Sequence, residues 1–298
     1  MSQPAFMCSR AAHERDDSMV ATAPPAQRWL LIEQEGAWPI NALDAFPTNV
    51  AHRIAARAAA ADARVSLIRR PGRHPREDRP IRWAFADVRP SNEGIRWGEA
   101  ASAADLLDMP WEVSPGEGEP VAIVCAHSRH DVCCAMKGRP VAQSLTDQWP
   151  GRVWECSHLG GDRFAATMVL LPTGLCFGRI TVDNAGAVLD AYEQGRVVPD
   201  LLRGRCAYTR QEQAAQSLAR AQGFGSDRID ALIPLGTTVV DHATFEVTLA
   251  ANPSVTVRAR ESTVPLGTPA TCRSTLLAEA REYAIVGTSL LDSRPEVL

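Results

Sequence analysis

The chain has 298 residues, of which 45% are hydrophobic and 22% are charged, and its formal net charge is −4. This composition excludes a disordered chain, which has too little apolar material to bury, and a small disulfide scaffold, which is shorter and denser in cysteine. The slightly acidic balance lacks the clustered positive charge of nucleic-acid-binding proteins, so we expect no nucleic-acid partner. The apolar runs fall short of the roughly 20 residues that a membrane-spanning helix needs, so we expect no membrane partner either.

The N-terminal residues mix small, polar and charged types and end in a proline-containing stretch, which predicts a flexible arm over residues 1–27. No uninterrupted apolar stretch follows a basic start, as it does in an export signal, and we expect a cytoplasmic protein. Thiols stay reduced in the cytoplasm. The eight cysteines are therefore better explained as core residues plus a metal or redox site than as four disulfides.

An N-terminal α/β region is predicted over residues 28–115. It contains a strand–helix–strand unit, two further strands and a short helix, and it ends at a break rich in proline and glycine around residues 110–120. The predicted strands are 28–33, 65–68, 81–88 and 95–97, and the predicted helices are 49–62 and 103–107.

The second region, residues 116–200, has the element order β-α-β-β-β-α. Its predicted strands are 121–124, 153–156, 165–171 and 175–180, and its helices are 138–148 and 185–194. This order matches a thioredoxin-like core in which the second helix has shrunk to the loop 160–163. The remaining residues, 201–298, are predicted to form an α+β extension with a helix at 211–222 and strands at 245–250, 254–258 and 283–286.

Cysteines and histidines gather directly after two predicted strands of the second region. Cys125 ends the first of these strands and is followed by His127, His130, Cys133 and Cys134; Cys156 ends the second and is followed by His158 and Asp162. In an α/β layer the loops at the carboxyl ends of strands converge on one crevice, so these side chains can share a ligand. Thiolates and imidazoles are the donors that iron-sulfur, zinc or copper sites require.

The spacing of these donors narrows the kind of site. The C-x-x-C motif is absent from the whole sequence, which argues against a thioredoxin dithiol and zinc-ribbon knuckles, and the plant-type ferredoxin run is absent too. What remains is a Cys125-x8-Cys134 loop opposite His158-x3-Asp162. Between the last two residues, Gly160 and Gly161 lack side chains and can adopt positive backbone angles, so this short loop can fold around a bulky inorganic centre.

With these motifs the sequence resembles the sucrase/ferredoxin-like proteins, whose defining unit is a thioredoxin-like 2Fe-2S ferredoxin domain. The resemblance is carried by residues 125–140, 154–165 and 170–179, and it extends over about residues 28–206. It implies an α/β fold with a thioredoxin-like ferredoxin core and a 2Fe-2S cluster that transfers single electrons to a redox partner protein. In eukaryotic relatives two Cys of a C-x8-C loop and two His of an H-x-G-G-H-like loop hold the cluster.

Carried over by position, the resemblance implies Cys125, Cys134 and His158 as ligands. Asp162 stands where the pattern has the second histidine. Three outcomes follow: Asp162 binds through oxygen, Cys133 or Cys156 supplies a thiolate instead, or the cluster has been lost. A histidine ligand raises the reduction potential above the roughly −400 mV of plant-type centres, because a neutral imidazole replaces an anionic thiolate.

Two other functions remain open from the residues themselves. One is a thiol-disulfide or peroxide-reacting enzyme that uses Cys133, Cys134 or Cys156 as a reactive thiol, and the other is a structural zinc site. We interpret His127 and His130 as supporting or exposed loop residues. The four other cysteines are expected to be structural or carry no signal: Cys8, Cys176, Cys206 and Cys272.

Overall fold

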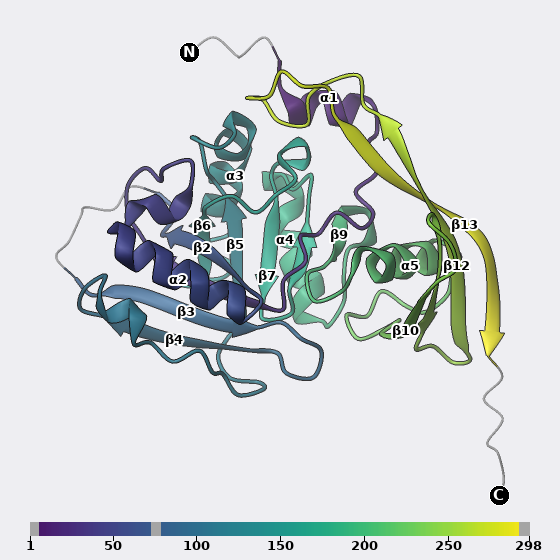
Figure 1. Cartoon of the computed structure of the whole chain (residues 1–298), viewed down its shortest axis with the longest axis horizontal. Coiled ribbons are helices and arrows are strands. Elements are labelled where there is room, and N and C mark those ends of the chain that lie inside the picture. Colours follow the sequence, from purple (N-terminus) through teal and green to yellow (C-terminus); the bar gives the residue numbers. More distant parts are fainter. Residues whose placement is uncertain (1–5, 73–78, 292–298) are drawn as a thin grey trace, which may run out of the picture.

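The computed structural model describes residues 6–72 and 79–291, which form an α/β protein with two β-sheets (Figure 1). The α-helices of this part are α1 (Cys8–Glu14), α2 (Thr48–Ala60), α3 (Val132–Ser144), α4 (Val182–Glu193) and α5 (Arg210–Ala221). The large sheet contains β1 (Arg28–Glu33), β2 (Ala63–Arg69), β3 (Ile81–Asp87), β4 (Gly94–Ala100), β5 (Val121–Cys125), β6 (Val153–Cys156), β7 (Met168–Leu171), β8 (Leu175–Phe177) and β9 (Leu202–Arg205). The smaller sheet contains β10 (Pro234–Val239), β11 (Thr244–Leu249), β12 (Ser254–Pro265) and β13 (Glu279–Leu291). Short 3-10 helices cover Ala42–Ala45, Asp105–Leu107, Asp162–Phe164 and Pro199–Leu201.

Two units with the same strand order make up most of the large sheet, which runs β4-β3-β1-β2-β6-β5-β7-β8-β9. In each unit two parallel strands are joined by a helix, as β1-α2-β2 and β5-α3-β6, and the next strand pairs antiparallel with the first. The units meet where β2 pairs antiparallel with β6. Residues 28–100 and 121–177 therefore form two such units within one continuous sheet.

The two faces of the large sheet are covered differently, because successive side chains of a strand point to opposite faces. On one face Leu30 and Ile32 of β1 pack with α2, and Val124 of β5 packs with α3 and α4. On the other face Trp29 and Leu31 share a core with the end of β5 and with the N-terminal segment. The candidate site residues at the end of β5 therefore border the face that the N-terminal segment covers.

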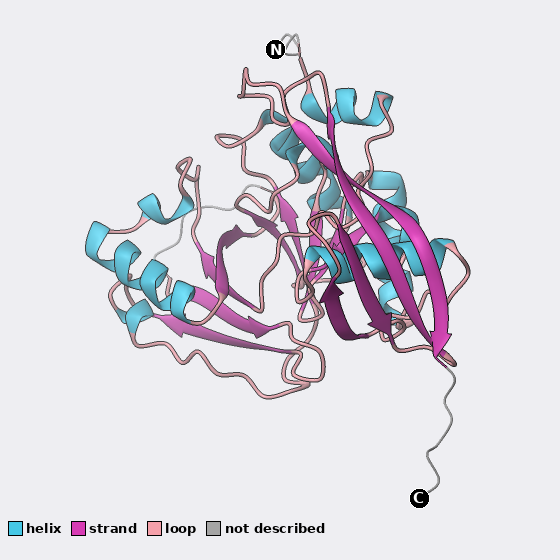
Figure 2. Cartoon of the chain, turned by 45° about the vertical axis from the view of Figure 1, so that its right-hand side comes forward, coloured by secondary structure: helices cyan, strands magenta, loops and turns pink. Residues whose placement is uncertain are grey.

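The smaller sheet has its own core against helix α5. Alternate residues of β11 and β12, among them Val247 and Val257, are fully buried with Ala214 and Ala215 of α5. Figure 2 shows the long β12–β13 hairpin running along this side of the molecule. The loop between its strands lies beside α1, so the N-terminal helix contacts a loop of the C-terminal region (Figure 1). The predicted α+β extension over 201–298 contains this sheet, although β9 at its start belongs to the large sheet.

The prediction of a flexible arm over residues 1–27 is wrong for residues 6–27. This segment contains α1 and buries Cys8, Ala12, Ala23 and Ala26 to 3% exposure or less. Its small apolar side chains pack on the face of the large sheet opposite α2, α3 and α4. The local sequence gives no sign of this contact. Residues 1–5 lie outside the described part of the chain.

Helix α3 begins six residues earlier than the predicted helix 138–148. Asp131 caps it: its side chain accepts a hydrogen bond from the backbone N–H of Cys133, which satisfies one of the free donors of the first turn. The loop that carries Cys133 and Cys134 in the sequence interpretation is therefore the first turn of a helix. Within the described residues, no helix has the length and apolar character to cross a membrane.

Candidate metal centre

The candidate site lies at the carboxyl ends of the parallel strands β5 and β6. Cys125 and Cys156 are the last residues of these strands and stand opposite each other in the register. After β5 the chain forms α3, and the first turn of this helix places Cys134 close to the end of β5. After β6 the loop of residues 157–161 carries His158 to the same place. The convergence predicted from the sequence is thus present.

Three of the predicted ligands lie within reach of one ion or cluster. The Sγ atoms of Cys125 and Cys134 and a ring nitrogen of His158 are all within 4.8 Å of one another. Both thiols are buried, at 0% and 1% exposure. Cys134 is in the first turn of α3, where the helix dipole favours negative charge, but its hydrogen bond with Cys125 and its burial raise its pKa.

Asp162, at the fourth predicted position, touches two of these ligands. Its Oδ1 lies 3.1 Å from Nδ1 of His158 and accepts a hydrogen bond of 3.1 Å from Sγ of Cys134. Its side chain is only 3% exposed. The contact with His158 is close but not aligned as a hydrogen bond, so Nδ1 of His158 is a buried polar atom without a hydrogen-bond partner among the described residues. A buried nitrogen that lacks a partner is suited to bind a metal.

The protonation states of this group are strongly shifted. A hydrogen bond from Cys134 and the neighbouring His158 lower the pKa of Cys125 well below its usual value, against the opposing effect of burial. Burial disfavours the charged form of His158, but its contacts with Asp162 and Cys125 outweigh this and raise the pKa of His158 to about 9. The pKa of Asp162 stays below its usual value because His158 offsets the cost of burial. The site therefore favours a thiolate and a carboxylate, both of which are metal ligands.

Two further histidines support the site. His127 is buried, its Nε2 lies 2.7 Å from the carbonyl oxygen of Pro39, and its Nδ1 accepts a hydrogen bond of 3.3 Å from the backbone N–H of His158. His127 thus holds the backbone of a predicted ligand. The ring of His130 lies over that of His158, with 3.5 Å between centroids, and its Nε2 is 3.6 Å from Oδ2 of Asp162. His130 is a further donor within reach of Asp162.

Gly160 and Gly161, predicted to give room to the centre, have different surroundings. Both have positive φ angles, +93° and +80°, as the sequence interpretation expected. A Cβ on Gly160 would meet open space, whereas a Cβ on Gly161 would overlap the guanidinium of Arg203. Arg203 is 2% exposed and donates to the carbonyl oxygens of Gly160 and Thr22, at 2.9 Å and 2.5 Å. Gly161 is therefore needed for the approach of an arginine that ties this loop to the N-terminal segment.

The two alternative thiolates are placed differently from the predicted ligands. Cys133 faces another group of donors, formed with Cys8, Asp131 and Cys272. Cys156 is fully buried among the apolar side chains behind Cys125, and burial raises its pKa well above the usual value. Within the described chain, neither belongs to the donor group of Cys125. Asp162 is not in that donor group either and groups instead with His130 and His158, but unlike these two thiols it contacts both Cys134 and His158.

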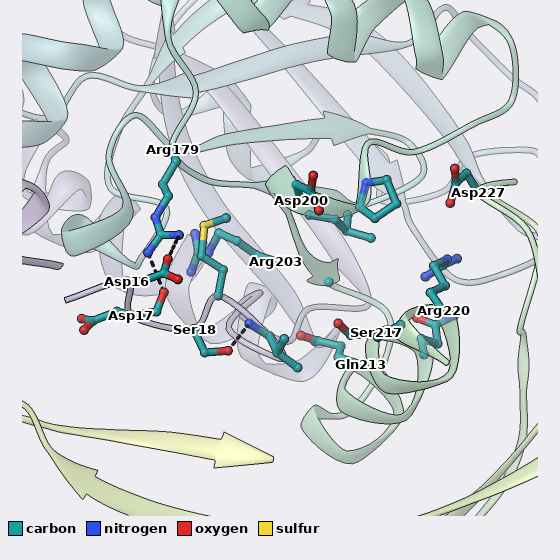
Figure 3. Close-up of a pocket in the computed structure, with 17 residues that line it drawn as sticks. Asp16, Asp17, Ser18, Arg179, Asp200, Arg203, Gln213, Ser217, Arg220 and Asp227 are labelled. Atoms are coloured by element: carbon teal, nitrogen blue, oxygen red, sulfur yellow. Dashed lines mark hydrogen bonds and ion pairs between the residues drawn. The ribbon is translucent and has the colours of Figure 1, made fainter. Parts of the chain in front are cut away.

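A surface pocket gives access to the histidine side of the site. Its lining includes His130, His158, Gly160, Asp162 and Arg203, together with the N-terminal segment 20–24. A second hollow also borders Arg203 and is lined by Asp16, Asp17, Arg179 and residues of α5 (Figure 3). There Arg179 donates to Asp16 and to the backbone of Asp17. The second hollow has no thiol or imidazole in its lining and is not a candidate for the metal.

The sequence interpretation missed three donors of the other group. Cys8 and Cys272 were taken to carry no signal, and Asp131 was not singled out, yet all three lie beside Cys133. Cys8 and Cys272 are 264 residues apart. A single aspartate before a helix is a signal for an N-cap, which could have identified the role of Asp131 at the start of α3.

The comparisons with known proteins identify a family. A family model described as Sucrase/ferredoxin-like matches residues 19–204, which is more than half of the chain. No curated protein and no solved structure matches the chain. The matched residues include all the predicted ligands after β5 and β6, but they exclude Cys8 and Cys272.

Proposed function

The chain belongs to the sucrase/ferredoxin-like family, and we propose that it binds a 2Fe-2S cluster and carries single electrons to a redox partner protein. The observation that carries this proposal is the convergence of two buried thiols and a ring nitrogen of His158, all within 4.8 Å of one another. Sulfur and imidazole nitrogen are the donors that such clusters take in proteins. The residues present therefore fit the group that the family implies.

We assign four residues of this chain as the ligands of the cluster: Cys125, Cys134, His158 and Asp162. The thiolates of Cys125 and Cys134 come from a strand end and a helix start, two rigid elements that hold them in place. Asp162 takes the fourth position through a carboxylate oxygen, because it is buried and already within 3.1 Å of both Cys134 and His158. When bound, the cluster would supply reversible one-electron chemistry.

The strand order supports the thioredoxin-like interpretation of this unit. The order β6-β5-β7-β8, with β6 parallel and β7 antiparallel to β5, is the order expected of a thioredoxin-like core. The 3-10 helix Asp162–Phe164 takes the place of the second helix of such a core. We infer that this short helix, which carries the proposed ligand Asp162, is what remains of the second helix of the core.

The partial exposure of His130 and His158 supports electron exchange with a partner protein. The side chains of His130 and His158 are 31% and 25% exposed and line the surface pocket, whereas Cys125 and Cys134 are enclosed. A partner protein that docks over this pocket comes closest to the cluster on its histidine side. Enclosure of the thiolates would keep water from the sulfur ligands, which affects the potential of such a centre.

The proposal is tested by analysing protein purified without oxygen. We expect about two iron and two acid-labile sulfide per chain, a visible charge-transfer spectrum, and an EPR signal of the reduced protein that shows coupling to nitrogen. Cys125→Ser and Cys134→Ser are expected to lose the spectrum. Cys176→Ala, which removes a buried thiol outside both donor groups, is expected to keep it.

Colourless protein that takes up no iron after reconstitution contradicts the proposal. In that case two alternatives from the sequence become testable on the same sample. Bound zinc without sulfide indicates a zinc site, and labelling of one cysteine near neutral pH indicates a reactive thiol. The burial of Cys133, Cys134 and Cys156 argues against thiol chemistry on a protein substrate, because such a thiolate must be accessible.

A further inference from the structure

A second group of donors brings together α1, the start of α3 and the loop between β12 and β13. Cys8 comes from α1, Asp131 and Cys133 from the start of α3, and Cys272 from the loop between β12 and β13. One donor atom of each lies within 4.8 Å of the others. We propose that these four residues bind a zinc ion, separate from the iron-sulfur site, that fastens α1 and the β12–β13 loop to α3.

The distances within this group are those of a tetrahedral site. The Sγ atoms are separated by 3.7 Å for Cys8 and Cys133, 3.2 Å for Cys133 and Cys272, and 3.5 Å for Cys272 and Cys8. Oδ1 and Oδ2 of Asp131 lie 3.8 Å and 3.7 Å from Sγ of Cys8. A tetrahedron with zinc–sulfur bonds of about 2.3 Å has sulfur–sulfur edges of roughly 3.8 Å. To reach such edges the thiols need to move apart by about 0.1 to 0.6 Å.

Asp131 can bind the ion while it caps the helix. Oδ1 accepts a hydrogen bond of 2.8 Å from the backbone N–H of Cys133, and Oδ2 accepts one of 2.6 Å from the backbone N–H of Cys272. Each carboxylate oxygen has two lone pairs, so one remains for the metal. These two hydrogen bonds also orient the carboxylate, as outer partners of metal ligands do.

Two sulfur atoms of the group have surroundings that stabilise negative charge. Cys133 is in the first turn of α3, where the helix dipole favours an anion. The backbone N–H of Cys8 donates to Sγ of Cys272 at 3.3 Å, which also favours a negatively charged sulfur. On binding, zinc displaces the remaining thiol protons, and no electron is transferred.

The two donor groups are kept apart by helix α3. Cys133 and Cys134 are adjacent on the helix, so their side chains point in directions about 100° apart. Cys133 therefore faces Cys8 and Cys272, while Cys134 faces Asp162 and the end of β5. A compact set of three thiols and one carboxylate suits a single ion. Cys8 and Cys272 lie outside the residues that match the family, so two of the four ligands come from the extensions of this chain and two from the matched region.

The test measures zinc and iron separately in the whole protein. Purified with zinc in the medium and a reductant, the protein is expected to hold about one zinc per chain, and Cys8→Ser and Cys272→Ser are expected to lower this to less than about a tenth. Iron and sulfide stay unchanged in both variants. Cys125→Ser is expected to give the opposite result, with iron lost and zinc kept, and Cys176→Ala keeps both.

A second measurement does not depend on how well the variants fold. Zinc is removed from the unmodified protein with a chelator and replaced by Co²⁺, which is expected to give the sulfur charge-transfer and d–d absorption bands of a tetrahedral site. Hydrogen exchange should then show that protection of residues 8–14 and of the loop around Cys272 is lost with the metal and recovered with it, whereas β5 and β6 stay protected.

Three results overturn the proposal. One is protein that binds no zinc under these conditions, including protein in which Cys133 and Cys272 form a disulfide instead. Another is loss of iron, rather than zinc, from Cys8→Ser or Cys272→Ser. The third is zinc that remains in these two variants and disappears from Cys125→Ser, because it would place the ion at the other site.

Discussion

Asp162 is the residue by which this chain departs from the two-histidine pattern that the family resemblance implies. Its carboxylate is 3% exposed and contacts both Cys134 and His158. An anionic oxygen ligand stabilises the oxidised, more positive state of an iron centre more than a neutral imidazole does. The chain is therefore expected to have a lower reduction potential than a relative with two histidine ligands.

Replacing Asp162 by histidine tests this expectation. Asp162→His should raise the midpoint potential, on the order of 100 mV, because a neutral nitrogen ligand replaces a negative oxygen. Potentiometric titration followed by EPR measures the change and shows the additional nitrogen. Asp162→Asn is the matched control, since it removes the charge without adding an imidazole. An unchanged potential and EPR spectrum in Asp162→His would exclude Asp162 as a ligand.

The glycines of the ligand loop make a second comparison at the scale of single residues. Both have positive φ angles, but only at Gly161 would an added Cβ overlap the guanidinium of Arg203. Gly161→Ala should therefore displace Arg203 and lower the iron content several-fold. Gly160→Ala has the same backbone strain, roughly 1 kcal/mol, without the overlap, and should keep most of the iron. Equal iron contents in the two variants would show that the contact with Arg203 does not position the loop.

At the scale of elements, helix α3 organises both donor groups. Its first turn supplies Cys133 to one group and Cys134 to the other, and Asp131 caps it. The helix can lie close to β5 because residue 138 is glycine: a Cβ there would overlap the carbonyl oxygen of Cys125. The position of Cys134 relative to Cys125 therefore depends on a residue that carries no functional group.

Gly138→Ala should lower stability although alanine favours helices. The added methyl group pushes α3 away from the end of β5, at a cost of about 1–3 kcal/mol, and the iron-sulfur spectrum should weaken as well. Gly186→Ala in α4 is the matched control, because its nearest neighbour is the flexible side chain of Gln148. That variant should gain up to about 1 kcal/mol. Denaturant unfolding measures both, and a stabilised Gly138→Ala would contradict the close approach.

At the scale of the whole molecule, the large and the small sheet have separate cores. The small sheet packs on α5 with a cluster of its own, whereas the proposed ligands Cys125 and Cys134 belong to a core cluster of the large sheet. The strand β9, helix α5 and the contacts of Cys272 connect the two parts. A mutation that destabilises the small core should thus have little effect on the proposed iron-sulfur site.

Leu249→Ala tests this separation. Leu249 is fully buried in the small core, and its truncation should cost about 2–5 kcal/mol of stability. Thermal unfolding followed by far-ultraviolet circular dichroism should move to lower temperature, while the visible spectrum at 25 °C stays unchanged. Val169→Ala, a truncation in the core beneath Cys125, is the comparison and should weaken both signals. Loss of the visible spectrum in Leu249→Ala would show that the two cores act as one.

Much of the framework and of the first donor group could be predicted from the sequence, because their signals are local. Strands 28–33 and 153–156 were predicted with the bounds that the structure has, since short runs rich in apolar residues ended by turn residues are typical of buried strands. Cys125 ends one of two neighbouring parallel strands and His158 follows the other, and the topology of α/β layers brings such residues together. The family resemblance added the identity of the proposed cluster.

Only the tertiary structure decided how the cysteines divide into two groups. Cys133 and Cys134 are adjacent and of one type, and their different directions depend on a helix that starts at Val132. The arm predicted over 1–27 is packed from residue 6 on, and Cys8 meets Cys272 across 264 residues. No local pattern encodes such a contact, because it depends on how separate elements pack and not on the propensities of either segment.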